Sequence, residues 1–591
     1  MSSSNGECST QPNGASSSKS KAQAAGGPKR TTVQHQQLPP RPKLVSTYPS
    51  ADAPRRPSSA QNGTHDDEAA YLPFALPGLH GAEGVEEEQD WVSIITAPAY
   101  APLQSWLTVM QSLIRHPERN SSNILRADIL AETPAGSSNV SEMEGARGWE
   151  KQWTIRRALL PRRPNLDWKM EQDCSLFYRF RGAATTLVEQ QHEHQDDREE
   201  EDAEVEEAVV VYTPLIGDAS HPKMAISEAA PVTTGQPPPS ESYVPFYHPK
   251  VRALAFHYLR SANHPSTLND DDNETFGQLS ISLIPFPPTP AFPPTHRLSR
   301  VGLSLLTTLH MHTWGDLHSY QKRVHHDTII PRSLYQDLYL SLKTKYAAEL
   351  IAGWKEATDP AKHVFEEMGI AAFLIGLWTL SYHQKGEGWQ KEIKFVDVGC
   401  GNGLLSYILA REGFTGIGLD MRARKSWSSY TPSASLKQWT FQPSTLLLPH
   451  HPDTHSEWTN AWLIGNHADQ LTPWLPLLAT HHRAAGFINL PCCYYALDGT
   501  RDFRLLLKTG GASSPVSRNE QYLAYVSQLH ERFGWQVELD PLRIPSTRNW
   551  CFVGRRRLAV SSEDEDEEMD KRVEEAVQEA LRGAWANPAS I

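Results

Sequence analysis

The chain has 591 residues, of which 39% are hydrophobic and 44 are prolines, so we expect two or three folded units with long irregular stretches. Its net charge of −13 is concentrated in two acidic runs, residues 196–207 and 563–568, and does not exclude a nucleic-acid partner. The cysteine spacing argues against a zinc finger, and the polar N-terminus argues against a secretory signal. The longest apolar run, 369–380, is too short for a membrane span, so we expect a cytoplasmic protein.

The first half of the chain is predicted to hold a tail and one α+β domain. Residues 1–90 are rich in Ser, Gly, Gln, Pro and Ala without apolar periodicity, and we expect them to be disordered. Residues 91–320 form the domain, with an acidic insert near 189–207. In this domain Leu103, Leu107, Met110 and Leu113 have helical spacing. Strands are predicted at Ala208–Ile216, Val251–Leu259 and Leu279–Pro285.

The second half, residues 321–560, is predicted to be an α/β domain. Two helices between 331 and 380 are separated by Asp359-Pro360, and then strand and helix signals alternate. Strands are predicted at 393–398, 416–420, 461–465, 485–490, 535–539 and 549–553, and helices at 402–412, 472–480 and 519–533. The alternation predicts a mostly parallel sheet covered on both faces and closed by a hairpin, with no third strand assigned in 425–460. An acidic tail, 561–591, contains an amphipathic helix that we expect to pack on the surface.

A glycine-rich turn is the clearest signal of a binding site. The strand ending at Val398 leads into glycines 399, 401 and 403, and the next strand ends at Asp420. Glycines let the backbone approach a ligand closely, because no Cβ intrudes. A carboxylate at the end of the next strand suits a ribose diol. The pattern therefore predicts a nucleoside-cofactor pocket at the carboxyl edge of the sheet; a tight strand–helix corner is the alternative.

The spacing of the turn excludes two other nucleotide-binding motifs. A dinucleotide fingerprint requires glycine where Leu404 stands, and no Gly-Lys-Ser/Thr follows for a phosphate loop. Asp397-x-Gly-x-Gly-x-Gly resembles the first motif of class I S-adenosylmethionine-dependent methyltransferases. The resemblance implies a Rossmann-like class I fold and S-adenosyl-L-methionine as cofactor. The candidate cofactor-binding residues are Asp397, Gly399, Gly401, Gly403, Asp420 and Arg422.

Further segments extend this resemblance to most of residues 91–560. They are Lys322–Thr328, Thr358–Phe365, Gly465–Trp474, Phe487–Tyr494 and Arg543–Asn549. With the glycine turn, they are similar to the eukaryotic tRNA (uracil-2′-O-)-methyltransferase family. The resemblance implies 2′-O-methylation of uridine 44 in serine tRNA and a tRNA-binding role for residues 91–320.

The catalytic candidates Asn466, His467 and Asp469 follow the strand at 461–465. A ribose hydroxyl is a poor nucleophile, and a neutral imidazole at His467 could take its proton. The alternative is that His467 and Asp469 cap the helix that follows. Residues 489–494 could pack against adenine or line the target pocket; the alternative is a buried strand end with inert thiols.

Basic residues in three places are candidates for RNA contacts, because Lys and Arg neutralise phosphates and aromatic rings stack on bases. They are Arg156, Arg157, Arg162 and Arg163, near Trp153 and Trp168; Lys322, Arg323, His325 and His326; and Arg548 and Asn549. A solvated surface role is the alternative for each arginine. The His-rich stretches at 192–194 and 450–455 lie in polar loops, and we expect no metal.

Two other functions fit the same residues. One is a cofactor-binding RNA adaptor without turnover, against which the intact glycine turn and Asp420 argue. The other is a protein methyltransferase, because the fold serves both substrate classes. The arginine clusters favour RNA over protein.

Overall fold

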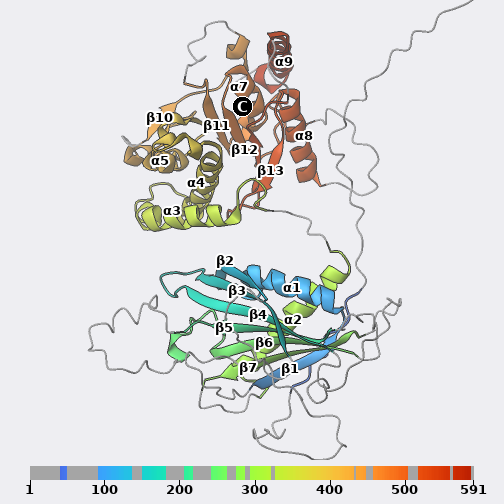
Figure 1. The fold of residues 1–591 in the computed structure, drawn as a ribbon. Helices are drawn as coiled ribbons and strands as arrows, with labels where there is room; N and C mark the ends of the chain where they lie inside the picture. The colour runs from blue at the N-terminus through green and yellow to red at the C-terminus, as the bar shows by residue number, and fades with distance from the viewer. Residues whose placement is uncertain are drawn as a thin grey trace, which may run out of the picture. The chain divides into compact units, whose positions relative to one another are not determined.

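The computed structural model divides the chain into two compact units, residues 1–321 and 322–591 (Figure 1). The described residues are 40–48, 91–135, 149–180, 205–216, 241–261, 275–286, 293–320, 326–430, 434–447, 457–503, 517–558 and 563–586. Part of the tail predicted to be disordered is ordered, because Thr47 pairs with Thr96 through backbone hydrogen bonds of 2.8 and 3.0 Å. Most of that tail and most of the acidic insert lie outside the described residues.

The first unit is built on a seven-stranded antiparallel sheet in the order β1-β7-β6-β5-β4-β3-β2. Its strands are β1 Val92–Ala99, β2 Ile124–Pro134, β3 Glu150–Pro161, β4 Met170–Phe180, β5 Val205–Pro214, β6 Val251–Arg260 and β7 Gly277–Pro285. The helices α1 (Leu103–Arg115) and α2 (Arg297–Leu317) pack against each other and the sheet. Trp106, Met110 and Leu306 are fully buried in the shared core.

The structure confirms the predicted helix as α1 and the three predicted strands as β5, β6 and β7. It adds β1 to β4 and α2, which the sequence pattern did not reveal. Gly302 lies in the interior of α2, where it packs closely on β1: an added Cβ there would lie 2.6 Å from Ile94 Cδ1. Glycine disfavours a helix interior, so close packing on β1 rather than intrinsic propensity accounts for this helix.

The second unit contains a seven-stranded sheet in the order β10-β9-β8-β11-β12-β14-β13. Its strands are β8 Lys394–Val398, β9 Thr415–Asp420, β10 Ser435–Gln438, β11 Ala461–Asn466, β12 Gly486–Leu490, β13 Glu538–Pro541 and β14 Trp550–Gly554. The first five strands in this order are parallel, β14 runs opposite to them, and β13, antiparallel to β14, runs in the same direction as the first five. The strand order reverses between β8 and β11, which is where open α/β sheets bind ligands.

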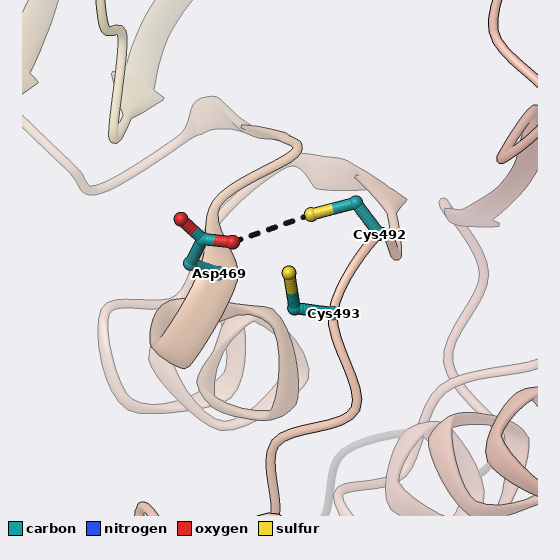
Figure 2. A group of neighbouring side chains, drawn as sticks. All are labelled: Asp469, Cys492 and Cys493. Atoms are coloured by element: carbon teal, nitrogen blue, oxygen red, sulfur yellow. Dashed lines mark hydrogen bonds between the residues drawn. The ribbon is translucent and has the colours of Figure 1, made fainter.

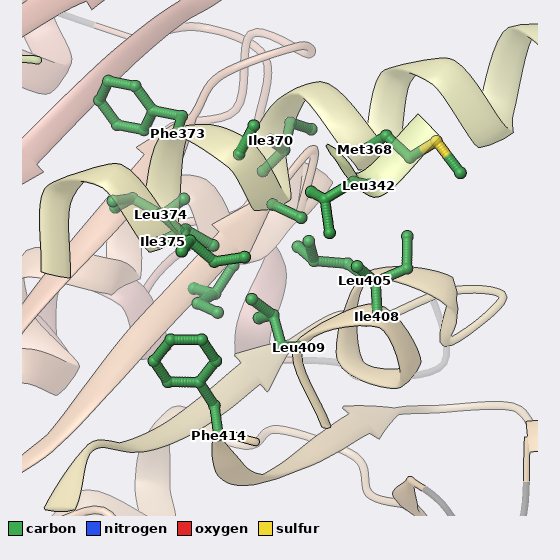
Figure 3. Close-up of a cluster of buried hydrophobic side chains, with 14 of the residues drawn as sticks. Leu342, Met368, Ile370, Phe373, Leu374, Ile375, Leu405, Ile408, Leu409 and Phe414 are labelled. Atoms are coloured by element: carbon green, nitrogen blue, oxygen red, sulfur yellow. The ribbon is translucent and has the colours of Figure 1, made fainter. Parts of the chain in front are cut away.

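Helices cover both faces of this sheet. One apolar cluster joins α3 (Arg332–Ala352), α4 (Pro360–Tyr382) and α5 (Leu404–Arg411), as Figure 3 shows. A second cluster joins α7 (Leu475–His481), α8 (Arg518–Arg532) and α9 (Glu563–Leu581), while the short α6 spans Trp427–Tyr430. The apolar run at 369–380 belongs to α4, which is long and apolar enough to cross a membrane, but 72% of its apolar window is buried in the protein, as in a core helix.

The predicted fold of this unit is confirmed, with three differences in detail. The third strand lies in the unassigned stretch as β10, which has only four residues. The helix predicted at 472–480 is a 3-10 helix, η8 (Asp469–Trp474), followed by α7. The tail helix α9 lies at the surface as predicted but packs more deeply than a tail: Val573, Ala576 and Val577 are buried in the core, because their spacing presents one apolar stripe, while Glu574 and Glu575 are exposed.

Candidate active site

The glycine turn after β8 has the open backbone that a ligand requires. Gly399, Gly401 and Gly403 have φ of +80°, +54° and +79°, values that favour glycine. The amides of Gly399 and Cys400 donate to the carbonyl of Leu419 at 2.8 and 2.9 Å, which fixes the turn against β9. An added Cβ on Gly401 would meet no protein atom within 4 Å. The turn therefore presents bare backbone to open space at Gly401, whereas a Cβ on Gly403 would lie 2.7 Å from Leu436 Cδ1.

Asp420 joins the end of β9 to this turn. One carboxylate oxygen accepts from the Gly401 amide and the other from the Arg422 amide, both at 3.0 Å. Each oxygen keeps a second lone pair, so the carboxylate still has acceptor capacity for a ribose diol. Arg422 itself is exposed, and the contact that the structure shows for it is made by its backbone.

Buried carboxyl groups lie next to the turn. Asp397 accepts from the Ser406 hydroxyl at 2.7 Å, and its other oxygen has no hydrogen-bond partner among the described residues. Burial, with a smaller contribution from Asp420, raises the pKa of Asp397 to about 7. Burial and then repulsion by Asp397 and Glu366 raise the pKa of Glu367 well above its usual range. Such a group of acids suits a cationic ligand.

The loop after β11 is held by two consecutive glutamates of α4. The Asn466 side-chain amide donates to Glu367 at 2.9 Å, and His467 Nε2 lies 3.2 Å from a carboxylate oxygen of Glu366. His467 has a φ of +52°, a strained value for a non-glycine residue. Its Nδ1 is buried without a partner among the described residues. When Nε2 carries the ring proton and donates it in a hydrogen bond to Glu366, Nδ1 keeps a lone pair that can accept a proton.

Asp469 does not cap the following helix. The N-terminal cap of η8 is Ala468, which makes no side-chain cap hydrogen bond, so the capping alternative is wrong for Asp469. Its carboxylate instead accepts from Cys492 Sγ at 3.4 Å, beside Cys493 (Figure 2). Ala468 lies 3.5 Å from the position of a Cβ on Gly399. The loop therefore lies against the glycine turn.

Two tyrosines of the segment after β12 lie against arginine side chains. The guanidinium groups of Arg518 and Arg548 lie 5.4 and 5.0 Å from the ring centre of Tyr494. Arg501 lies 5.0 Å from the ring centre of Tyr495. Arg548 thus belongs to a group with Arg518 and Tyr494, which lie far apart in the sequence and meet only in the fold.

Two more residues predicted to contact RNA, Asn549 and His326, contact the protein backbone in the structure. The Asn549 side-chain amide donates to the Leu542 carbonyl at 2.7 Å and so holds the β13–β14 ends together. His326 Nδ1 lies 2.8 Å from the Pro541 carbonyl. Lys322, Arg323 and His325 lie outside the described residues.

The structure separates the arginines predicted as an RNA-binding cluster on β3. Arg156 forms a two-pronged ion pair with Asp173, at 2.8 and 2.9 Å, and Arg162 and Arg163 are exposed. Arg157 is only 3% exposed and bonds Gln172 and the last carbonyls of α1. Consecutive strand residues face opposite sides, so we do not assign Arg157 to RNA.

Known proteins resemble both units. Two family models match: "TRM44-like, N-terminal bet v1-like domain" over residues 66–323 and "Predicted AdoMet-dependent methyltransferase" over residues 329–441. The tRNA (uracil-O(2)-)-methyltransferase of Schizosaccharomyces pombe is 33% identical over 506 residues, which cover 80% of this chain and 87% of that relative. The Neurospora crassa enzyme of the same name is 34% identical over 520 residues, covering 82% and 90%. A solved TehB-like SAM-dependent methyltransferase from Corynebacterium glutamicum is 13% identical, covering 37% of this chain and 97% of that one with a TM-score of 0.18, too low to support a conclusion.

Proposed function

The chain belongs to the tRNA (uracil-O(2)-)-methyltransferase family, and we propose that it methylates the ribose 2′-oxygen of a uridine in tRNA, with S-adenosyl-L-methionine as the methyl donor. The finer parts of the proposal are uridine 44 as the target, serine tRNA as the substrate and the cytoplasm as the location. These finer parts rest on the family resemblance and the sequence. The observation that carries the reaction is the meeting of the glycine turn, Asp420 and His467 at one sheet edge.

The residues at this edge fit the donor. S-adenosyl-L-methionine supplies an electrophilic methyl group on a sulfonium and also carries an ammonium and a ribose diol. Asp420 has free lone pairs for the diol, and the open face of Gly401 admits the adenosyl group. The unpartnered oxygen of buried Asp397 and the carboxyl group of Glu367 suit the positive charges. The proposed cofactor-binding residues thus keep their roles; they are Asp397, Gly399, Gly401, Gly403 and Asp420. Arg422 contributes through its backbone amide.

Positioning accounts for most of the catalysis in this proposal. Holding the 2′-oxygen in line with the methyl carbon can lower the barrier by about 7–11 kcal/mol. As the oxygen–carbon bond forms and the sulfur–carbon bond breaks, the hydroxyl proton leaves. His467 takes it on Nδ1, while Glu366 holds the ring through Nε2 and stabilises the imidazolium. Asn466, tied to Glu367, fixes the loop that carries His467.

The arginine and tyrosine side chains after β12 provide the RNA contacts. Arg501, Arg518 and Arg548 are partly or fully exposed, and each contacts a tyrosine ring. Guanidinium groups neutralise phosphates, and aromatic rings stack on unpaired bases. In the first unit, Arg156, Arg162 and Arg163 stay candidates for contacts to the rest of the tRNA.

The proposal is tested by incubating the full chain with labelled S-adenosylmethionine and total tRNA, then mapping the modified nucleosides. We expect label in 2′-O-methyluridine of tRNA, with serine tRNA as the labelled species, and an initial rate of labelling lower by about 10²–10⁴-fold with His467→Ala. Label in protein and none in RNA would indicate a protein methyltransferase. Donor binding with no label in either would indicate an adaptor without turnover.

A further inference from the structure

Two thiols and a carboxylate meet beside the active site in an arrangement that methyl transfer does not itself require. Cys492 and Cys493 follow β12, and Asp469 opens η8 after β11. The two Sγ atoms and a carboxylate oxygen of Asp469 lie within 4.8 Å of one another. Figure 2 shows the three side chains directed at the same space. Two of the three are cysteines without a CxxC spacing, so the sequence pattern alone excluded this site.

The distances suit a small tetrahedral metal ion. Cys492 Sγ lies 3.4 Å from Asp469 Oδ1. A zinc ion with Zn–S of about 2.3 Å and Zn–O of about 2.1 Å separates the sulfur from the oxygen by about 3.6 Å at the tetrahedral angle. The observed separation therefore requires only a small side-chain adjustment. The ligands also come from the ends of two adjacent parallel strands, a rigid support for a metal site.

The chemistry of the three side chains also favours a cation. A divalent ion binds the thiolate forms of Cys492 and Cys493 and displaces their protons, and the Asp469 carboxylate adds a third anionic ligand.

We propose that Asp469, Cys492 and Cys493 bind one zinc ion and leave its fourth position open to a substrate oxygen. Two thiolates select zinc over magnesium or calcium, which prefer oxygen ligands. Three protein ligands with an open position are typical of catalytic rather than structural zinc. The loop of Asp469 also carries His467 and packs on the glycine turn, so the open position lies beside the methyl-transfer site. We assign it to the target ribose hydroxyl, whose proton a bound zinc ion makes more acidic; this assignment rests on the proposed function.

Metal binding is measured first, without reference to activity. The full chain, kept in a non-thiol reductant and stripped with a chelator, is titrated with Zn²⁺ by calorimetry and with Co²⁺ by absorption. We expect one ion per chain and a sulfur-to-cobalt charge-transfer band. Cys492→Ser and Cys493→Ser should each weaken binding at least about a hundredfold, and Asp469→Asn about tenfold or more.

Cys174→Ala is the matched control, because Cys174 is a buried thiol of the first unit. It should keep the ion and the band. Circular dichroism of each variant checks folding, and affinity for S-adenosylhomocysteine checks the cofactor pocket. A wild-type chain that binds no ion, or variants that bind it as tightly as the wild type, would overturn the zinc site.

Methylation assays then test the open position. If the open position of the zinc ion holds the ribose hydroxyl, the enzyme should lose tRNA methylation when a chelator removes the metal and regain it when Zn²⁺ is added. Affinity for the methyl donor should stay unchanged. Zinc binding by these ligands with full methylation after chelation would overturn the hydroxyl assignment. Zinc binding by a chain that never methylates tRNA would support the site and contradict the proposed function, so the two failures are distinguishable.

Discussion

Both units are built on seven-stranded sheets, but they differ in where buried polar side chains gather. In the antiparallel sheet, charged and polar side chains pair across strands, as Arg156 does with Asp173 and Arg157 with Gln172. The hydroxyl groups of Ser93 and Tyr212, unpartnered in the part of the chain that the structure describes, lie on separate strands, β1 and β5. In the parallel sheet, the strands' carboxyl ends meet at one edge, where buried polar atoms of Asp397, Asn466 and His467 have no partner among the described residues. Because leaving buried polar groups unpaired costs free energy, such a concentration marks the place where a ligand binds.

The largest effect is expected at the unpartnered imidazole. His467→Ala should lower kcat by about 10²–10⁴-fold, the usual contribution of a general base, because Nδ1 no longer accepts the proton. Affinity for S-adenosylhomocysteine should stay within about twofold, since His467 bonds Glu366 rather than the glycine turn. Single-turnover kinetics measure the first quantity and calorimetry the second. Full activity in this variant would remove His467 from the mechanism.

The second-largest effect is expected at Asp420, whose carboxylate joins β9 to the glycine turn. Asp420→Ala should weaken S-adenosylhomocysteine binding by about 10- to 100-fold, because charged hydrogen bonds contribute about 1.5–3 kcal/mol. The variant also releases the Gly401 amide. Asp173→Ala is the control, since it removes a paired carboxylate from the other sheet. Equal affinity in the wild type and Asp420→Ala, measured by equilibrium dialysis, would show that the ribose contact is wrongly assigned.

Two adjacent arginines of β3, Arg156 and Arg157, test whether burial decides how much a charged side chain of the antiparallel sheet contributes to stability. Arg157→Met should lower the free energy of unfolding by about 1–3 kcal/mol, because it leaves Gln172 and the end of α1 without their donor. Arg156→Ala should change it by less than about 1 kcal/mol, as expected of an exposed pair. Chemical denaturation followed by fluorescence compares the two. An equal loss in both variants would contradict the burial difference.

The smallest effect is a pH dependence from Asp397. Burial raises the pKa of Asp397 to about 7, so its contribution to stability is complete below about pH 4 and is lost as the pH rises through about 7. A cationic donor favours the ionised form, so donor affinity should rise by up to about tenfold per pH unit below 7 and then level off. Calorimetry compares the wild type with Asp397→Asn, which keeps Glu366, Glu367 and Asp420. An identical pH profile in both proteins would exclude Asp397 as the titrating group.

The sequence was most informative where local rules decide the structure. The glycine turn and Asp420 were predictable because positive φ at Gly399, Gly401 and Gly403 requires glycine and because the strands alternate with helices. Glu366 and Glu367 were missed because they lie 101 and 99 residues from their partners and meet them only in the fold. Their signal was a pair of carboxylates opening the apolar part of α4.

The antiparallel unit was less predictable for a different physical reason. Its strands β2 to β4 carry charged and polar residues, several of which face residues of neighbouring strands, so their sequences lack a clear apolar alternation. Without β3, the sequence could not tell that Arg156 faces solvent and Arg157 faces the core. The proposed zinc ligands could not be grouped from the sequence, because Asp469 lies 23 residues before Cys492 and meets the two cysteines only in the fold.

Hydrogen–deuterium exchange of the full chain, with and without S-adenosylhomocysteine, tests the location of the site most directly. We expect the ligand to protect the amides of residues 397–403, 420–422 and 466–469, which form the turn and the loops beside it. The amides of β3 and β4 should exchange as before. Protection in β3 and β4 with none at the glycine turn would contradict the account.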